Sequence, residues 1–297
     1  MKTTLFLKAS CMFHLPSQLR RRFEILITLY PKRLFKTPVD AECISPDFFA
    51  EKSAKEIAAL QIWEGNRRRE VGDLFKIKHE TGSQSDEVTV RICGDVSKVR
   101  KIGAKMSMGN IIVEGDVGMH LGEKMNGGVI TVTGNADSWA GSMMKKGTIE
   151  IKGDAGDYIG ASYRGSTQGM NGGKIVIYGN AGYEVGCFMR KGLIKVYGDI
   201  GKFAGIHMRN GTIFIQGNSE GRAGAQMIDG KIVVCGYVPS ILPTFTIDDI
   251  RQKVKVNGEK LEGPFYRFIG DLADKGKGKL FVSKNRNLHL SSYEEYL

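Results

Sequence analysis

The chain has 297 residues, and its hydrophobic content of 41% and charged content of 25% are ordinary for a globular protein. It has no run of about 18 apolar residues, so we expect neither a transmembrane helix nor a membrane partner. The formal net charge of +11 is concentrated near the N-terminus, where eight Lys or Arg side chains within residues 1–38 face a single Glu. Because nucleic-acid-binding proteins carry a basic patch on the folded body, we expect no nucleic-acid partner.

The cysteines indicate a reducing environment. Their number is odd and none forms a CxxC pair, which argues against a disulfide framework and against a cysteine-held metal. They are Cys11, Cys43, Cys93, Cys187 and Cys235. We therefore expect a cytoplasmic protein.

Residues 23–93 are predicted to form an N-terminal cap with a short helix. Ser53 and Glu56 have the spacing of a capping box, which predicts a helix over residues 53–60. Four apolar residues then indicate a strand that leads toward the next segment: Val71, Leu74, Phe75 and Ile77. Alternating apolar residues at Val88, Val90 and Ile92 predict the strand that starts this segment.

A repeat of 19 residues fills residues 94–236, which hold 31 of the 39 glycines. Each repeat begins with Gly, followed by Asp or Asn in all but the last case, and carries two further glycines with a methionine between them. The methionines are Met106, Met125, Met144, Met170, Met189, Met208 and Met227. Two repeats are longer: the first has two extra residues before Gly103, and the fourth has seven, at residues 163–169.

Each repeat also contains an Ile and then an Ile or Val two residues later, which predicts one strand per repeat. The Ile column is Ile111, Ile130, Ile149, Ile175, Ile194, Ile213 and Ile232. One repeat cannot bury this face alone, whereas stacked repeats can. The predicted fold class is therefore all-β: a right-handed parallel β-helix of about seven coils with small caps at both ends.

The regularly spaced polar and small residues have structural interpretations. Glycine at a corner permits positive φ or a close approach of two backbones, and Asp or Asn can bond to backbone groups at the turn. The methionines are expected to fill irregular core space. Stacked carboxylates could instead bind calcium, but Asn135, Asn180 and Asn218 interrupt the acids, so we favour turn chemistry.

Residues 237–297 are predicted to form a C-terminal cap and tail. Asn257-Gly258 lies between apolar residues that include Val254, Val256 and Leu261, which indicates a β-hairpin running on to Ile269. The stretch from Lys275 to Leu297 is polar, and we interpret it as a tail that docks on a neighbour.

The sequence contains no pattern for chemistry. We expect no catalytic, cofactor-binding or metal-binding residues, because HxH, HExxH, GxGxxG and Walker patterns are absent. His120 and His207 occupy different positions in their repeats and do not form an evident pair. The one irregular feature is the fourth-repeat insertion, which is either a tolerated surface loop or a partner contact with Tyr163, Arg164 and Gln168 as candidate residues.

The repeat formula G-[DN]-x-G…G-x-x-M-x-x-G-x-I-x-V-x-G resembles the GXGXG β-helix domain. That domain is shared by the C-terminal domain of the glutamate synthase large subunit and by the C subunit of formylmethanofuran dehydrogenase. Residues 153–160, 162–165 and 205–208 resemble the second, as do the flanking residues 45–49, 256–259 and 265–266. The resemblance runs from about Phe23 to about Val282.

The resemblance implies a non-catalytic scaffold subunit of an oxidoreductase complex that reduces CO2 to formyl-methanofuran with reduced ferredoxin. It implies partners of three kinds: a molybdo- or tungstopterin subunit, an amidohydrolase-like subunit with a binuclear metal site, and iron–sulfur subunits. The cofactors would lie in those subunits. The alternatives are a structural GXGXG domain of a glutamate synthase-like enzyme and the C subunit of a bacterial formyltransferase/hydrolase complex.

The resemblance does not extend to the first residues. Residues 1–22 are basic and lack the repeat. We interpret them as the product of a misassigned gene start, with a disordered arm as the alternative.

Overall fold

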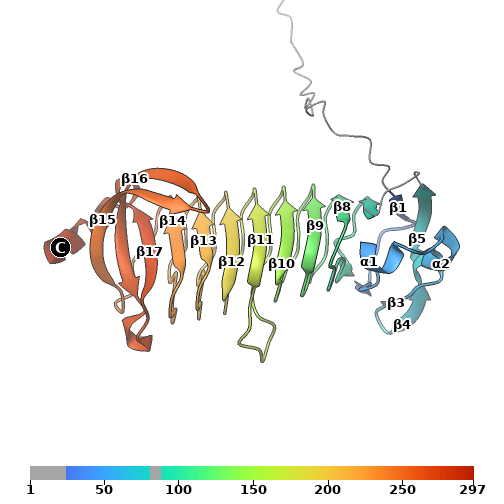
Figure 1. The fold of residues 1–297 in the computed structure, drawn as a ribbon, viewed down its shortest axis with the longest axis horizontal. Coiled ribbons are helices and arrows are strands. Elements are labelled where there is room, and N and C mark those ends of the chain that lie inside the picture. The colour runs from blue at the N-terminus through green and yellow to red at the C-terminus, as the bar shows by residue number, and fades with distance from the viewer. Residues whose placement is uncertain (1–24, 81–87) are drawn as a thin grey trace, which may run out of the picture.

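The structure is a computed structural model, and it describes residues 25–80 and 88–297. The predictions for residues 1–22 lie outside the described residues. The molecule is elongated, with its strands side by side across the long axis (Figure 1). No helix in the described part of the chain is long and apolar enough to cross a membrane.

The central segment is a row of parallel strands, and each predicted repeat contributes one of them. Consecutive strands pair in chain order within a 13-stranded sheet. The strands are β6 (Val88–Cys93), β8 (Asn110–Glu114), β9 (Asn126–Val132), β10 (Lys146–Ile151), β11 (Asn171–Ile177), β12 (Lys191–Val196), β13 (Thr212–Ile215) and β14 (Lys231–Val234). Ile111 lies opposite Ile130, and Ile130 lies opposite Ile149, so the predicted Ile column is confirmed.

The inner face of this row is a hydrophobic core. Every member of the Ile and Met columns is fully buried. Burial of one Ile or Met side chain contributes about 1.5–3 kcal/mol, and stacking repeats this gain at each level. A second ladder of isolated parallel bridges runs through Val96, Val117, Ala136, Ala155 and Ala181, which joins the repeats on another side.

The glycine columns have two different physical causes. Gly186 has φ +72°, and a Cβ there would lie 2.6 Å from Ile213 Cδ1. Gly198 has no such φ, but a Cβ there would lie 2.4 Å from Asn180 Oδ1 and 2.6 Å from the Gly179 carbonyl carbon. Glycine is therefore required at Gly186 by conformation and space together, and at Gly198 by close approach alone.

The N-terminal cap covers the first strands. β1 (Ile25–Pro31) pairs in parallel with β6 and antiparallel with β5 (Phe75–Glu80). A four-stranded sheet lies beside them, made of β2 (Val39–Asp40), β3 (Gln61–Glu64), β4 (Arg67–Glu70) and β7 (Val99–Arg100). Two short helices, α1 (Pro46–Phe49) and α2 (Ala54–Ala58), complete the cap, and the capping box of Ser53 and Glu56 is confirmed.

The predicted strand from Val71 to Ile77 is wrong in its first half. Residues Val71–Leu74 form helix α3, and the strand begins only at Phe75. Glu70 and Asp73 make a second capping box, in which the Glu70 N–H donates to Asp73 Oδ2 at 3.0 Å. Val71 and Leu74 are spaced by three residues, so one helical turn buries both.

The C-terminal segment contains the predicted hairpin. β15 (Thr246–Val256) and β16 (Glu259–Gly270) are antiparallel. Asn257 and Gly258 both have positive φ, as a two-residue hairpin turn requires. The inner side of the hairpin packs on the outer face of β12–β14, where Val254, Val256 and Phe265 meet Leu193, Phe214 and Val233.

The interpretation of Lys275–Leu297 as a polar tail is wrong. β17 (Gly278–Ser283) lies inside this stretch, parallel to β14 and antiparallel to β16. Leu280 and Val282 are buried, and this short apolar run is the reason for the strand. Short 3-10 segments flank it: η1 (Leu272–Asp274), η2 (Lys284–Arg286) and η3 (Leu288–Tyr296).

Candidate functional site

The fourth-repeat insertion is the one loop that leaves the regular stack, and it does so just before β11 (Figure 1). Its far end is tied to the body: Arg190 donates to the Thr167 carbonyl at 3.3 Å, and the Gly169 N–H donates to the Phe188 carbonyl at 3.1 Å. Within the loop the Gln168 N–H donates to Ser166 Oγ at 3.1 Å. The loop therefore has an anchored base.

The near end of the insertion packs on two rings of a three-ring stack that comes from successive repeats. His120 stacks on Trp139 with 5.4 Å between ring centroids, and Trp139 stacks on Tyr158 at 4.5 Å. Tyr163 of the insertion tilts against His120 at 5.5 Å and meets Trp139 edge-on at 6.2 Å. We call these four residues the aromatic cluster. Such pairs contribute about 0.5–1.5 kcal/mol each beyond their buried area.

The first three rings of the aromatic cluster come from one column of the repeat. His120, Trp139 and Tyr158 each lie two residues before a glycine and have φ of 61–63°. This left-handed conformation is unfavourable for residues with a Cβ. It is held by hydrogen bonds to the next repeat, such as that from the Trp139 N–H to the Asp157 carbonyl at 2.9 Å.

A carboxylate lies beside the aromatic cluster. His120 Nδ1 is 3.3 Å from a Glu123 oxygen, and Lys124 Nζ is 3.3 Å from the other. The His120 ring is the main cause that lowers the pKa of Glu123 below its usual range, with Lys124 contributing in the same direction. Glu123 is thus held ionised next to the rings.

A groove of about 440 Å³ runs beneath the insertion. Lys105, Lys124 and Lys145 line it together with Gln168 from the insertion. Lys105 forms an ion pair with Glu42 at 2.7 Å, whereas Lys145 forms none with any described residue. We call this hollow the lysine groove. Its chemistry suits an anionic group.

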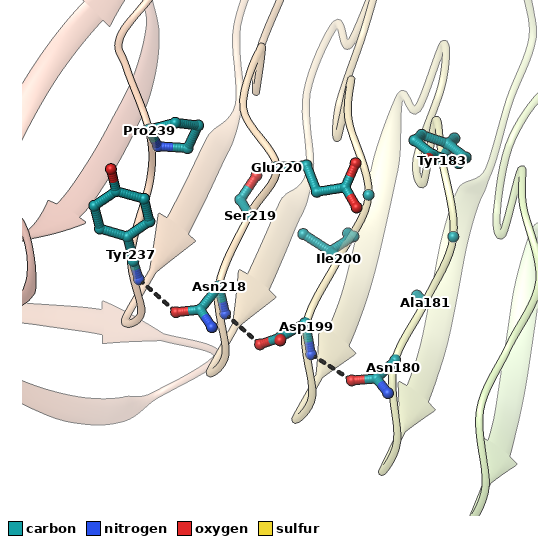
Figure 2. Close-up of a pocket in the computed structure, with 12 residues that line it drawn as sticks. Asn180, Ala181, Tyr183, Asp199, Ile200, Asn218, Ser219, Glu220, Tyr237 and Pro239 are labelled. Carbon is teal, nitrogen blue, oxygen red and sulfur yellow. Dashed lines mark hydrogen bonds between the residues drawn. The ribbon is translucent and has the colours of Figure 1, made fainter.

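A second hollow, of about 490 Å³, lies along the opposite ends of the strands. Figure 2 shows its floor, where Asn180, Asp199 and Asn218 stand in a row. Each side-chain oxygen accepts a hydrogen bond from the backbone N–H one repeat further on, at 2.7–2.8 Å. We call this row the Asx ladder. The predicted bonding of Asp and Asn to backbone groups is confirmed, but the bonded N–H groups belong to the next repeat rather than to the same turn.

The candidate residues from the sequence are separated by the structure. Tyr163 belongs to the aromatic cluster, and Gln168 lines the lysine groove. Arg164 is exposed and forms no ion pair within the described part of the chain. His207 stacks on Phe188 at 4.4 Å, so it is not a partner of His120.

Sequence reasoning missed the aromatic cluster and the lysines. The signal was present as columns: His120, Trp139 and Tyr158 share one repeat position. Basic residues also recur just before the predicted strands, at Lys145, Arg190 and Arg209.

The described residues do not fit a metal centre. Among residues 25–80 and 88–297, no three or more His, Cys, Asp or Glu side chains are grouped to hold a metal ion. Burial raises the pKa of Cys43 to about 11, of Cys187 to about 12 and of Cys235 to about 11. Burial therefore keeps these three thiols in their protonated form in the described chain.

These features define a class: an elongated, mostly β protein whose repeats each add one parallel strand to a long sheet, with a lateral loop before β11. No family model matches the chain. The C subunit of tungsten-containing formylmethanofuran dehydrogenase 2 from Methanococcus maripaludis is 50% identical over 260 residues, which cover 84% of this chain and 94% of that protein. The same subunit from Methanothermobacter thermautotrophicus is 48% identical over 268 residues, covering 90% and 98%.

A solved structure is also similar. A chain of the formyltransferase/hydrolase complex from Methylorubrum extorquens, in complex with methylofuran, has a TM-score of 0.76 and 33% identity, covering 86% of this chain and 99% of that chain. With two relatives near 50% identity over almost their whole length, the protein belongs to the family of formylmethanofuran dehydrogenase C subunits. The predicted resemblance is confirmed.

Proposed function

We propose that this chain is a non-catalytic scaffold subunit of a formylmethanofuran dehydrogenase complex that reduces CO2 to formyl-methanofuran with reduced ferredoxin. The observation that carries the proposal is the 50% identity to the C subunit of such an enzyme over 94% of its length. The regular stack supports it, since its inner face is core and its corners are occupied by hydrogen-bonded turns.

The parallel strand ladder and the second ladder of bridges support the finer description of the fold. We interpret residues 94–236 as a right-handed parallel β-helix of about seven coils. Residues 23–93 and 237–297 are then its caps. In this role the protein works in the cytoplasm and offers length and rigidity to larger subunits.

In the proposed complex the redox and condensation chemistry belong to other subunits. A molybdo- or tungstopterin subunit, iron–sulfur subunits and an amidohydrolase-like subunit with two metals would bind around this chain. The names of these two relatives specify tungsten-containing enzymes. They support a metal of this kind in the pterin subunit of the proposed complex. The lack of a grouped set of His, Cys, Asp or Glu side chains among the described residues supports the placement of the metal outside this chain.

The proposed partner contact is the insertion, through Tyr163, Arg164 and Gln168. Its exposed Tyr and Arg are residue types that dominate binding energy at protein interfaces. Its anchored base supports the same role, because a loop fixed by Arg190 and the aromatic cluster loses little conformational entropy when a partner binds.

Excision of residues 163–169 tests both parts of the proposal. It places Met170 three residues after Gly160, as in every other repeat, so we expect a folded chain with an unfolding temperature within a few degrees of the wild type. Affinity purification of the co-expressed complex should recover the metal-containing subunits with the wild-type chain and markedly less with the excised chain. Equal recovery would remove the insertion from the interface, and recovery of the wild-type chain alone would refute the scaffold role.

A second candidate function is that of the C subunit in a formyltransferase/hydrolase complex. The similarity to a chain of that complex, at a TM-score of 0.76, favours it. The two candidates differ in their co-purifying activity: ferredoxin-dependent formation of the formyl product supports the first, and formyl transfer and hydrolysis without a pterin metal support the second.

A further inference from the structure

Five basic side chains follow one corner of the stack, at the end where the strands begin. They lie just before or at the start of β10, β12 and β13: Lys145, Lys146, Arg190, Lys191 and Arg209. All are exposed except Arg190, which is half-buried because it holds the insertion. We call these five residues the basic strip.

Backbone hydrogen bonds place the basic strip on neighbouring levels. The Lys145 N–H donates to the Met125 carbonyl, the Arg190 N–H to the Met170 carbonyl and the Arg209 N–H to the Met189 carbonyl, each at 2.8 Å. These bonds occupy the same position in successive repeats, so Arg190 and Arg209 are one level apart, about 4.8 Å. Lys145 is two levels from Arg190, with Asn171 between them.

The charges of the basic strip are not neutralised within the described residues. No ion pair joins any of its five members to another part of the described chain, although such pairs occur elsewhere along it. The strip continues into the lysine groove, where Lys105 and Lys124 already have carboxylate partners. Lys145 belongs to both, so the groove opens onto the unpaired charges.

The opposite ends of the same strands carry acidic groups. Asp154 and Asp199 follow β10 and β12, and they belong to the Asx ladder or its continuation. A strand of six residues separates Lys146 from this edge by about 20 Å. The stack is therefore polarised from one strand end to the other, and a partner is oriented by its own charge before short contacts form.

We propose that the basic strip and the lysine groove together dock an acidic, extended segment of a partner polypeptide. The occupant is a peptide because the groove also offers Asn126 and Asn171 side-chain amides and the Met143 side chain, which suit backbone and aliphatic groups. The insertion forms one wall through Gln168, so the segment lies between insertion and body. This inference rests on the proposed function and names the chemistry of one partner surface.

The first test uses the full chain and a fluorescent ten-residue peptide of alternating Asp and Ser. Charge reversal at three unpaired positions, Lys145→Glu, Lys146→Glu and Lys191→Glu together, should weaken binding at low salt by about tenfold or more. The matched control reverses three exposed lysines elsewhere, Lys76→Glu, Lys202→Glu and Lys260→Glu, and should change binding by about twofold at most. Thermal unfolding establishes that both variants are folded.

Equal weakening by both variants would overturn the proposal, since it would show an effect of net charge alone. Wild-type binding by the strip variant would overturn it as well. A ten-nucleotide RNA that competes better than the peptide would also overturn it, in favour of a nucleic-acid surface.

The second test uses the co-expressed complex with a photo-crosslinker, p-benzoylphenylalanine, in place of Asn171. The crosslinked partner segment, identified by mass spectrometry, should carry an excess of Asp and Glu. A crosslink to a neutral or basic segment would overturn the docking proposal while the scaffold role stands. Failure of the wild-type chain to join any complex would overturn the scaffold role, and the peptide titration would still decide on the basic strip.

Discussion

Single residues of the Asx ladder join the repeats, and their alternation limits electrostatic repulsion. From Asp116 onward, Asp and Asn alternate, and each side chain accepts a hydrogen bond from the next level at 2.7–2.8 Å. Two carboxylates on adjacent levels would lie about 4.8 Å apart. At an exposed site such a pair costs about 1 kcal/mol. Alternation of Asp with Asn keeps a hydrogen-bond acceptor on every level and doubles the distance between neighbouring carboxylates.

Asn180 tests this explanation. Asn180→Asp retains the acceptor for the Asp199 N–H but places three carboxylates on consecutive levels, Asp154, residue 180 and Asp199. We expect a loss of about 1–2 kcal/mol of unfolding free energy at low salt, largely recovered in 1 M salt because screening acts on exposed charges. Asn180→Ala removes the acceptor instead and should cost about 1 kcal/mol independently of salt. Denaturant unfolding at two salt concentrations separates the two outcomes, and equal salt dependence would contradict the explanation.

At the scale of elements, the sequence predicts what recurs or depends on local turn and capping chemistry, and misses what depends on distant partners. The Ile, Met and glycine columns were predictable because each repeat meets the same surroundings above and below. The hairpin was predictable from Asn257-Gly258, whose turn chemistry is local. β17 was not, because its apolar run is short and its parallel partner, β14, lies more than forty residues away. The insertion was located, but its packing on His120 and Trp139 depends on stacking across repeats.

One carboxylate of the last element, η3, binds two side chains of the C-terminal segment. Tyr266 Oη donates to Glu294 at 2.7 Å, and Lys284 Nζ donates to its other oxygen at 2.8 Å. The Lys284 ammonium is the main cause that lowers the pKa of Glu294 below its usual range, and Tyr266 adds to it. A lowered pKa in the folded state means that this stabilisation is complete above the ordinary carboxyl range and is lost as pH falls through the lowered value.

The variant Glu294→Gln should therefore unfold at a lower temperature than the wild type near neutral pH. The difference should shrink toward zero in acid, where the wild-type carboxylate is protonated too. Glu295→Gln, at an exposed neighbour, is the control and should match the wild type at every pH. Circular dichroism melts between pH 3 and pH 7 provide the measurement. A difference that stays constant with pH would show that packing of η3, rather than the ion pair, stabilises this end.

At the scale of the whole molecule, stability should be close to a sum over neighbouring levels, since strand pairing joins each repeat to the ones beside it, although the ring contact of Tyr163 with His120 spans two levels. The N-terminal cap meets the stack through the first repeat: Lys101 pairs with Asp40, Lys105 with Glu42, and the Gly103 N–H donates to the Ile44 carbonyl. The second repeat, residues 115–133, can therefore be removed without loss of these cap contacts.

Removal of residues 115–133 should leave a folded, shorter protein. The deletion joins Glu114 to Gly134 and lets β8 pair with β10 in the existing register, with Ile111 opposite Ile149 and Val113 opposite Ile151. We expect a retained β-sheet spectrum and one cooperative transition at a reduced temperature, because one level of buried Ile, Val and Met is lost. Removal of residues 115–123 alone is the matched control: it breaks the 19-residue period and should abolish the transition. If both deletions unfold the chain alike, then contacts beyond neighbouring repeats stabilise the stack. In that case the number of repeats could not change one at a time to match the spacing of partner subunits.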